Sequence, residues 1–264
     1  MDIWASGMSL DLNKLYRTQI GPLILWLKRH FDEIHIAVEH CEDETFESET
    51  VAFSPEDETC KEPEDWKRWV VGENGNTISF LPIMPDRPVV VRPEVPVIIP
   101  EGHEALFFVS IPVWVKIVVN DKKELVLCEA PSVVLSNIWF GDTMSGELCY
   151  SLRTKARRQI LDAEPKPHRA VCPVKIRNTT SSQLDIERFC VHVEYLNIYK
   201  GTTRLWTNEV CINFQGEDSA NKIHYTQKPP EYETVEGIVG KARTVLKKTL
   251  LKKSLGTFKL LTGI

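Results

Sequence analysis

The sequence predicts a mostly β protein made of two antiparallel β-sandwich-like units, followed by a basic amphipathic helix. Three observations support this class. Short apolar runs alternate with polar positions over much of the chain, prolines separate many of these runs, and the apolar spacing becomes helical after Pro230. A chain of 264 residues is long enough for one large domain or two modest ones. We therefore expect three parts, at residues 1–160, 161–230 and 231–264.

The first unit contains the clearest strand patterns. Residues 23–27 form a short apolar run, and Ile34, Ile36 and Val38 alternate with their neighbours, which favours half-buried strands. A helix over residues 22–31 is an alternative for the first run. Proline cannot donate to a β-ladder, so the prolines from Pro82 onward mark strand ends and turns. The further strand candidates are 89–91, 97–99, 106–109, 113–119 and 125–127.

The second unit and the tail follow a linker that contains Pro165 and Pro167. Residues 171–176, 184–199 and 205–214 have the composition of strands. Beyond Pro230, apolar residues recur with helical spacing from residue 235 to residue 250, and lysines lie between them. This pattern predicts a basic amphipathic helix within residues 231–264.

Charge is distributed unevenly along the chain. The formal net charge is −5, but residues 39–65 hold twelve acidic residues and one lysine, and residues 237–264 hold seven Lys or Arg and no acid. The acidic stretch has few large apolar residues, so we expect a solvated loop. The remainder is nearly neutral and lacks the basic surface of a nucleic-acid-binding protein. Seven cysteines without close pairs, and no secretory leader, favour a cytoplasmic protein.

The segment from Gly141 to Gly146 is the first candidate for chemistry. Its glycines are not followed by the Lys-Ser/Thr pair of a phosphate-binding loop, and Ser145 lacks the glycine pattern of a nucleophile elbow. A strand, a compact loop and a second strand explain the pattern as a plain hairpin. The functional alternative is a recognition loop, whose polar groups would be Asp142, Ser145, Glu147 and Arg153.

Metal and catalytic motifs are absent from the sequence. No two cysteines lie within four positions, and Cys190 with His192 is one of only two tight mixed pairs. Two residues at i and i+2 share a face of any strand, so buried cysteines without a ligand are the favoured interpretation. Most carboxylates lie in the acidic loop, where solvent would keep their pKa values ordinary. We predict no metal ligands, no cofactor and no catalytic residues.

The basic tail is the sharpest functional feature. An amphipathic basic helix can bind an anionic lipid surface or lie in a partner's groove, and it can equally pack on its own β units with its lysines as a solvated rim. Only Phe258 represents the aromatic residues common in interfacial helices, which favours a protein partner. The predicted contact residues are Lys241, Lys247, Lys248, Lys252 and Lys253.

Residues 141–150, Gly-Asp-Thr-Met-Ser-Gly-Glu-Leu-Cys-Tyr, carry a resemblance to a known family. Together with the proline-rich stretch at 96–100, the strand at 107–113 and residues 170–180, they resemble an uncharacterised prokaryotic family, chiefly archaeal, known only as a domain of unknown function. The similarity covers roughly residues 20–225. The family supplies no catalytic residues. An association of its members with small-conductance mechanosensitive channels implies a membrane-protein partner.

The sequence thus predicts a non-enzymatic, cytoplasmic interaction or accessory module. It would dock to a membrane protein, or peripherally to the anionic surface of the inner membrane, and would not bind nucleic acid. A second hypothesis is a small-molecule sensor with a pocket between the β units, lined by Trp114, Trp139 or Trp206. A hydrolase with a Ser or Cys near a His is a distant third.

Overall fold

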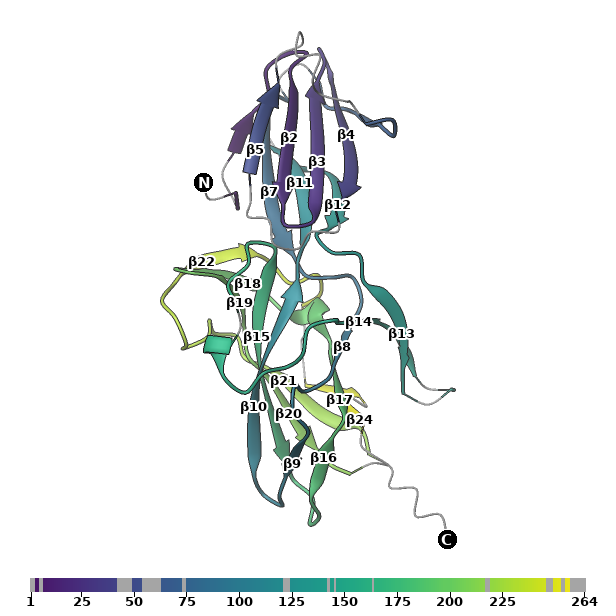
Figure 1. The fold of residues 1–264 in the computed structure, drawn as a ribbon, viewed down its shortest axis with the longest axis vertical. Helices are drawn as coiled ribbons and strands as arrows, with labels where there is room; N and C mark the ends of the chain where they lie inside the picture. The colour runs from purple at the N-terminus through teal and green to yellow at the C-terminus, as the bar shows by residue number, and fades with distance from the viewer. Residues whose placement is uncertain are drawn as a thin grey trace. The chain divides into compact units, whose positions relative to one another are not determined.

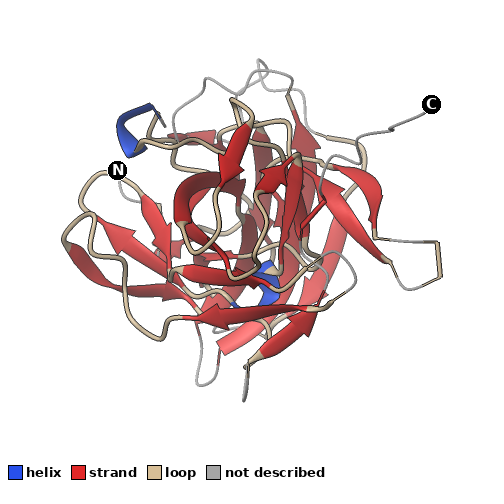
Figure 2. Cartoon of the chain, turned by 90° about the horizontal axis from the view of Figure 1, so that it is seen from below, coloured by secondary structure: helices blue, strands red, loops and turns tan. Residues whose placement is uncertain are grey.

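In the structure, a computed structural model, almost all of the regular secondary structure is β-strand (Figures 1 and 2). It describes residues 3–4, 7–41, 49–53, 63–72, 75–120, 124–141, 143–144, 146–162, 164–216, 219–245, 249–252 and 255–256. Helical segments within these ranges are limited to two 3-10 turns, η1 (Ile160–Asp162) and η2 (Val193–Tyr195). The predicted mostly β class is confirmed. Among the described helices, none has the length and apolar character needed to span a membrane.

The chain divides into two compact units that interleave along the sequence. Unit 1 comprises Met1–Ile83, Pro112–Val134 and Lys166–His168, and unit 2 comprises Met84–Ile111, Leu135–Pro165 and Arg169–Ile264. The parts predicted from the sequence, residues 1–160, 161–230 and 231–264, are consecutive along the chain, whereas these units interleave. The units interleave because strands such as β7 and β11 pair with each other across a long sequence separation, which a linear pattern does not encode.

Unit 1 contains a four-stranded and a five-stranded antiparallel sheet. The strand order of the first is β1 (Gly7–Ser9), β7 (Thr77–Ile83), β11 (Trp114–Asn120) and β12 (Glu124–Pro131). The order of the second is β5 (Glu49–Phe53), β2 (Leu15–Ile20), β3 (Leu23–Arg29), β4 (Glu33–His40) and β6 (Lys67–Val70).

Both sheets of unit 1 bury alternate apolar side chains. Leu23, Leu25 and Leu27 on β3 are fully buried, as are Ile78 on β7 and Ile117 on β11. This alternation is typical of sheets that pack face to face, and Figure 1 draws the β2–β3–β4 sheet in front of β7 and β11.

The unit 1 structure also settles two sequence-based expectations. The run at residues 23–27 is strand β3 rather than a helix. The stretch at residues 39–65, expected to be a loop throughout, contains strand β5, which pairs with β2. A strand forms there because β2 offers a free sheet edge to its backbone. Residues 42–48 and 54–62 lie outside the described ranges.

Unit 2 contains three sheets. The largest has the order β22 (Val235–Gly240), β18 (Ile198–Gly201), β19 (Leu205–Thr207), β15 (Arg169–Asn178), β20 (Val210–Phe214), β21 (Asn221–Tyr225) and β23 (Leu250–Lys252), and β10 (Glu104–Pro112) also pairs with β15. The second has the order β13 (Ser136–Phe140), β14 (Glu147–Ser151), β8 (Val89–Val91), β17 (Arg188–Val191) and β24 (Leu255–Gly256). The third pairs β16 (Leu184–Ile186) with β9 (Val97–Ile99). Most pairs are antiparallel, but β15 runs parallel to β19 and β20, and β14 runs parallel to β8.

The predicted C-terminal helix is wrong. Strand β22 pairs with β18, β23 pairs with β21, and β24 pairs with β17. Gly237 and Gly240 lower helix propensity, and Val235, Ile238 and Val239 are β-branched, so the local chemistry of β22 suits a strand. The tail therefore extends the edges of two sheets in unit 2 and presents no helical basic face in its described part.

Candidate functional site

A β-hairpin in unit 2 carries the predicted recognition loop. Strand β13 pairs antiparallel with β14, and Phe140 lies opposite Glu147 at the end near the loop. Gly141 has a φ of +108°, and a Cβ atom built on it would lie 2.8 Å from the Cα of Gly146. Only glycine fits this turn without strain. The predicted strand–loop–strand arrangement is confirmed.

Glu147 is the centre of a polar cluster at the start of β14. Its Oε1 accepts a hydrogen bond from Nε2 of His192 at 2.6 Å, and its Oε2 lies 2.5 Å from Nζ of Lys252. The His192 side chain is fully buried, whereas those of Glu147 and Lys252 are 25% and 39% exposed. One carboxylate thus joins the hairpin to the residue after β17 and to the C-terminal strand β23.

Two buried thiols lie next to this carboxylate. Cys149 on β14 and Cys190 on β17 are fully buried, and their Sγ atoms are 3.8 Å apart. Strand β8 pairs with both β14 and β17, and its Val90 packs with the two cysteines and Phe140. Ligand atoms of Glu147, Cys149 and Cys190 all lie within 4.8 Å of one another. Among the described residues, this is where the chain could hold a metal ion.

The cluster strongly shifts the ionisation of its members. Burial opposes the charge on Glu147, but the hydrogen bonds from His192 and Lys252 outweigh it and lower the pKa of this carboxyl to about 2. Burial raises the pKa of the Cys190 thiol well above its ordinary value, and the neighbouring Cys149 adds to the effect. Burial also raises the pKa of Glu194. Glu147 is therefore a carboxylate at neutral pH, next to a neutral Cys190 thiol.

The structure brings together two of the predicted site residues that came from different segments. Glu147 from the loop and Lys252 from the tail form an ion pair, whereas Arg153 and Lys241 are exposed. Asp142, Ser145, Lys247, Lys248 and Lys253 lie outside the described residues.

The tryptophans expected to line a pocket have different environments. Trp206 is buried, and its Nε1 donates to Glu233. The Trp139 side chain lies on the hairpin and is 47% exposed.

The sequence does not predict that Cys149, Cys190 and His192 lie together. It offers a signal only for Cys190 and His192, because these two residues form a closely spaced Cys-His pair. Cys149 lies 41 positions before Cys190. The contact between the two thiols depends on the strand order β14–β8–β17, which cannot be predicted from the sequence pattern.

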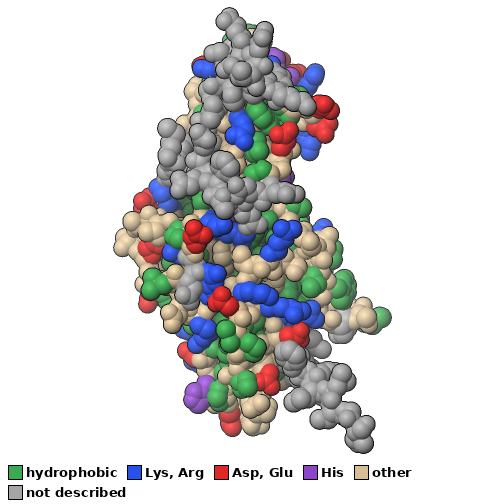
Figure 3. Space-filling view, in the orientation of Figure 1, with side chains coloured by type: hydrophobic (Ala, Val, Ile, Leu, Met, Phe, Trp, Pro, Cys, Tyr) green, Lys and Arg blue, Asp and Glu red, His purple; other side chains and the backbone are tan. Residues whose placement is uncertain are grey.

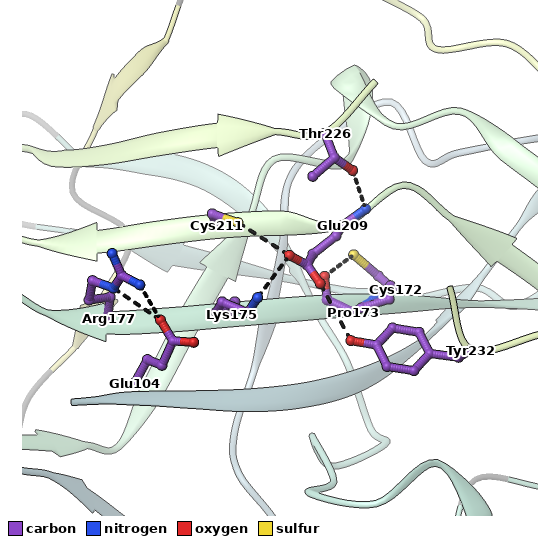
Figure 4. Close-up of polar contacts among 9 residues, drawn as sticks. All are labelled: Glu104, Cys172, Pro173, Lys175, Arg177, Glu209, Cys211, Thr226 and Tyr232. Carbon is purple, nitrogen blue, oxygen red and sulfur yellow. Dashed lines mark hydrogen bonds and ion pairs between the residues drawn. The ribbon is translucent and has the colours of Figure 1, made fainter. Parts of the chain in front are cut away.

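A second polar network lies on the large sheet of unit 2 (Figure 4). The Glu209 carboxylate is 3.4 Å from Nζ of Lys175 and accepts hydrogen bonds from Cys211 and Tyr232. Burial and Glu209 raise the pKa of the Cys211 thiol to about 11. A thiol with such a pKa is a poor nucleophile at neutral pH, so this network is best explained as charge compensation on the sheet.

Comparison with known proteins identifies the chain at family level only. Residues 8–259 match the model of a family described as "Protein of unknown function (DUF432)". The chain belongs to the DUF432 family. The match spans the hairpin, the Glu147 cluster and the described strands from β2 to β24. No curated protein and no solved structure matches this DUF432 member.

Proposed function

We propose that this DUF432 protein is a non-enzymatic interaction module that binds an extended segment of a partner protein along strand β13. The observation that carries this proposal is an exposed apolar surface on an edge strand. Strand β13 ends the sheet order β13-β14-β8-β17-β24 and pairs, among the described strands, with β14 alone. An edge strand presents backbone N–H and C=O groups that a partner's strand can pair with.

The two faces of the hairpin differ in character. Phe140 and Cys149 are buried on the inner face, whereas Trp139 and Leu148 lie directly opposite each other and are 47% and 43% exposed. Met144 in the loop is 93% exposed. Large apolar side chains gathered on an exposed strand are typical of interaction surfaces. Hydrophobic side chains are also visible on the projecting hairpin in Figure 3.

Polar contacts fix the base of the hairpin. Arg87 donates to Oδ1 of Asn137 at 3.1 Å and lies over the Tyr150 ring, and the Tyr150 hydroxyl donates to Asp86. A surface held in place before binding loses less conformational entropy when a partner binds. These contacts support recognition by the hairpin.

The charge near the hairpin indicates the chemistry of the partner. Arg153 and Lys155 follow β14 directly and are exposed, and Figure 3 shows further Lys and Arg side chains on the drawn face of unit 2. We therefore expect the partner segment to be extended, to carry apolar residues at alternate positions, and to contain acidic side chains that meet this basic surface.

Selection from a displayed library of random peptides tests this proposal. The full chain should enrich peptides of the expected pattern, and Trp139→Ser should weaken binding of a selected peptide about 10-fold or more, because exposed tryptophans often dominate binding energy. Leu161→Ser is the matched control, since Leu161 in η1 is 90% exposed but lies outside the hairpin. If the Trp139→Ser variant bound the selected peptide as tightly as the wild type does, this would contradict the proposal. If the wild type and the Trp139→Ser variant co-sedimented equally with anionic vesicles, a membrane surface would be favoured instead of a partner protein.

A further inference from the structure

We propose that Glu147, Cys149 and Cys190 form a binding site for a thiophilic divalent metal ion of the Zn²⁺ type. The three residues offer one carboxylate oxygen and two sulfurs within 4.8 Å of one another. Sulfur ligands select soft or borderline metals over Mg²⁺ and Ca²⁺, which prefer oxygen. This inference is independent of the proposed function, because it concerns the inner face of β14 rather than the exposed surface of the hairpin.

The separation of the two sulfurs fits a shared metal. Two thiolates at about 2.3 Å from a tetrahedral zinc ion are about 3.8 Å apart, and the Sγ atoms of Cys149 and Cys190 are 3.8 Å apart. A disulfide would require about 2.05 Å, so the two sulfurs are not bonded to each other. The thiols approach each other from β14 and β17, the two strands that flank β8.

The surroundings of Glu147 suit a metal ligand. His192 and Lys252 each hold one oxygen of its carboxylate. Each oxygen has a second lone pair, so Glu147 can bind a cation without losing either contact. Metal-binding carboxylates are commonly oriented by outer hydrogen bonds of this kind. His192 lies outside the group of ligand atoms, and we assign it the role of positioning the carboxylate.

The charges around the site also balance. Binding of M²⁺ releases the two thiol protons to solvent, so that two thiolates and one carboxylate give the bound site a charge of −1. The ammonium group of Lys252 compensates this charge. Nearby, Oε2 of Glu194 is buried and accepts no hydrogen bond from any described residue, which leaves an acceptor beside the cluster. A tetrahedral ion would need a fourth ligand besides these three, either water or another oxygen.

Titration of the reduced, chelator-treated full chain with Co²⁺ tests the site. We expect one Co²⁺ per chain, with thiolate-to-cobalt charge-transfer absorption of the intensity of two thiolates and the visible bands of tetrahedral cobalt. Zn²⁺ should displace the Co²⁺. Cys149→Ser and Cys190→Ser should weaken Co²⁺ binding by more than the roughly 10–100-fold that loss of an outer partner costs.

Controls separate a metal site from nonspecific thiol binding. Cys211→Ser should leave the Co²⁺ affinity unchanged, because Cys211 belongs to the separate Glu209 network. Glu147→Gln should reduce the affinity while keeping both thiolate bands. If the serine variants do not fold, the two-thiolate spectrum of the wild-type chain still decides the question. Failure of the reduced wild-type chain to bind Co²⁺ at micromolar concentration, or a spectrum that lacks thiolate ligation, would overturn the proposal.

Discussion

Gly21→Ala is expected to destabilise unit 1 by about 2–5 kcal/mol. Gly21 is in the two-residue turn between β2 and β3, where its φ is +58°. A Cβ atom built there would lie 2.2 Å from Nδ1 of His168, whose side chain is fully buried. The substitution therefore combines an unfavourable left-handed backbone with a clash against a fully buried ring. Urea denaturation followed by circular dichroism measures the loss.

Gly72→Ala provides the matched control for this prediction. Gly72 is also in unit 1 and has a φ of +79°, but among the described residues other than its chain neighbours, no atom lies within 4 Å of a Cβ built on it. Its substitution should cost only the backbone term, about 1–2 kcal/mol. If the two alanine variants were equally stable, the close contact between Gly21 and His168 would not exist in solution.

The local elements of the fold were predictable where the sequence pattern is strict. Ile34 and Ile36 are buried and lie in strand β4, and the glycines at 141 and 146 mark the hairpin turn. The tail was not predictable from its apolar spacing. Residues 235–250 match a helical period, but the glycines and β-branched residues of β22 favour a strand, and β22 and β23 also gain backbone partners in a sheet.

The candidate site was predictable only in fragments. The charges of Glu147 and Lys252 predict a functional role for each residue separately, for Glu147 in a loop and for Lys252 in a helix. Their ion pair, and their proximity to Cys149 and Cys190, arise from three strands that are distant in sequence, β14, β17 and β23. Strand register decides these contacts, and a one-residue change of register would turn Cys149 to the exposed face of the hairpin.

Glu147→Gln is expected to destabilise the protein at neutral pH and to change its acid sensitivity. The folded state lowers the pKa of this carboxyl from 4.5 to about 2. That difference corresponds to at most about 3 kcal/mol of stability. The amide of Gln can still accept one hydrogen bond but cannot pair with Lys252 as an anion. We expect a loss of about 1–3 kcal/mol at pH 7, measured by urea denaturation in the presence of a chelator.

The sign of the pH effect follows from the lowered pKa. Above about pH 4.5 the carboxyl is ionised in both states, and its contribution to folding is complete. As the pH falls from 4.5 toward 2, the unfolded chain takes up the proton first, so this contribution is progressively lost. The stability difference between wild type and Glu147→Gln should therefore shrink across this window.

Glu236→Gln is the control for the loss of stability expected between pH 4.5 and pH 2. Glu236 pairs with Lys200 at 2.6 Å, but its side chain is 59% exposed, so its loss should cost less than about 1 kcal/mol. A Glu147→Gln deficit that stayed constant from pH 7 to pH 2.5 would contradict a charged Glu147 held by His192 and Lys252. A deficit that narrows on acidification would confirm that ionised Glu147 stabilises the fold through its contacts with His192 and Lys252.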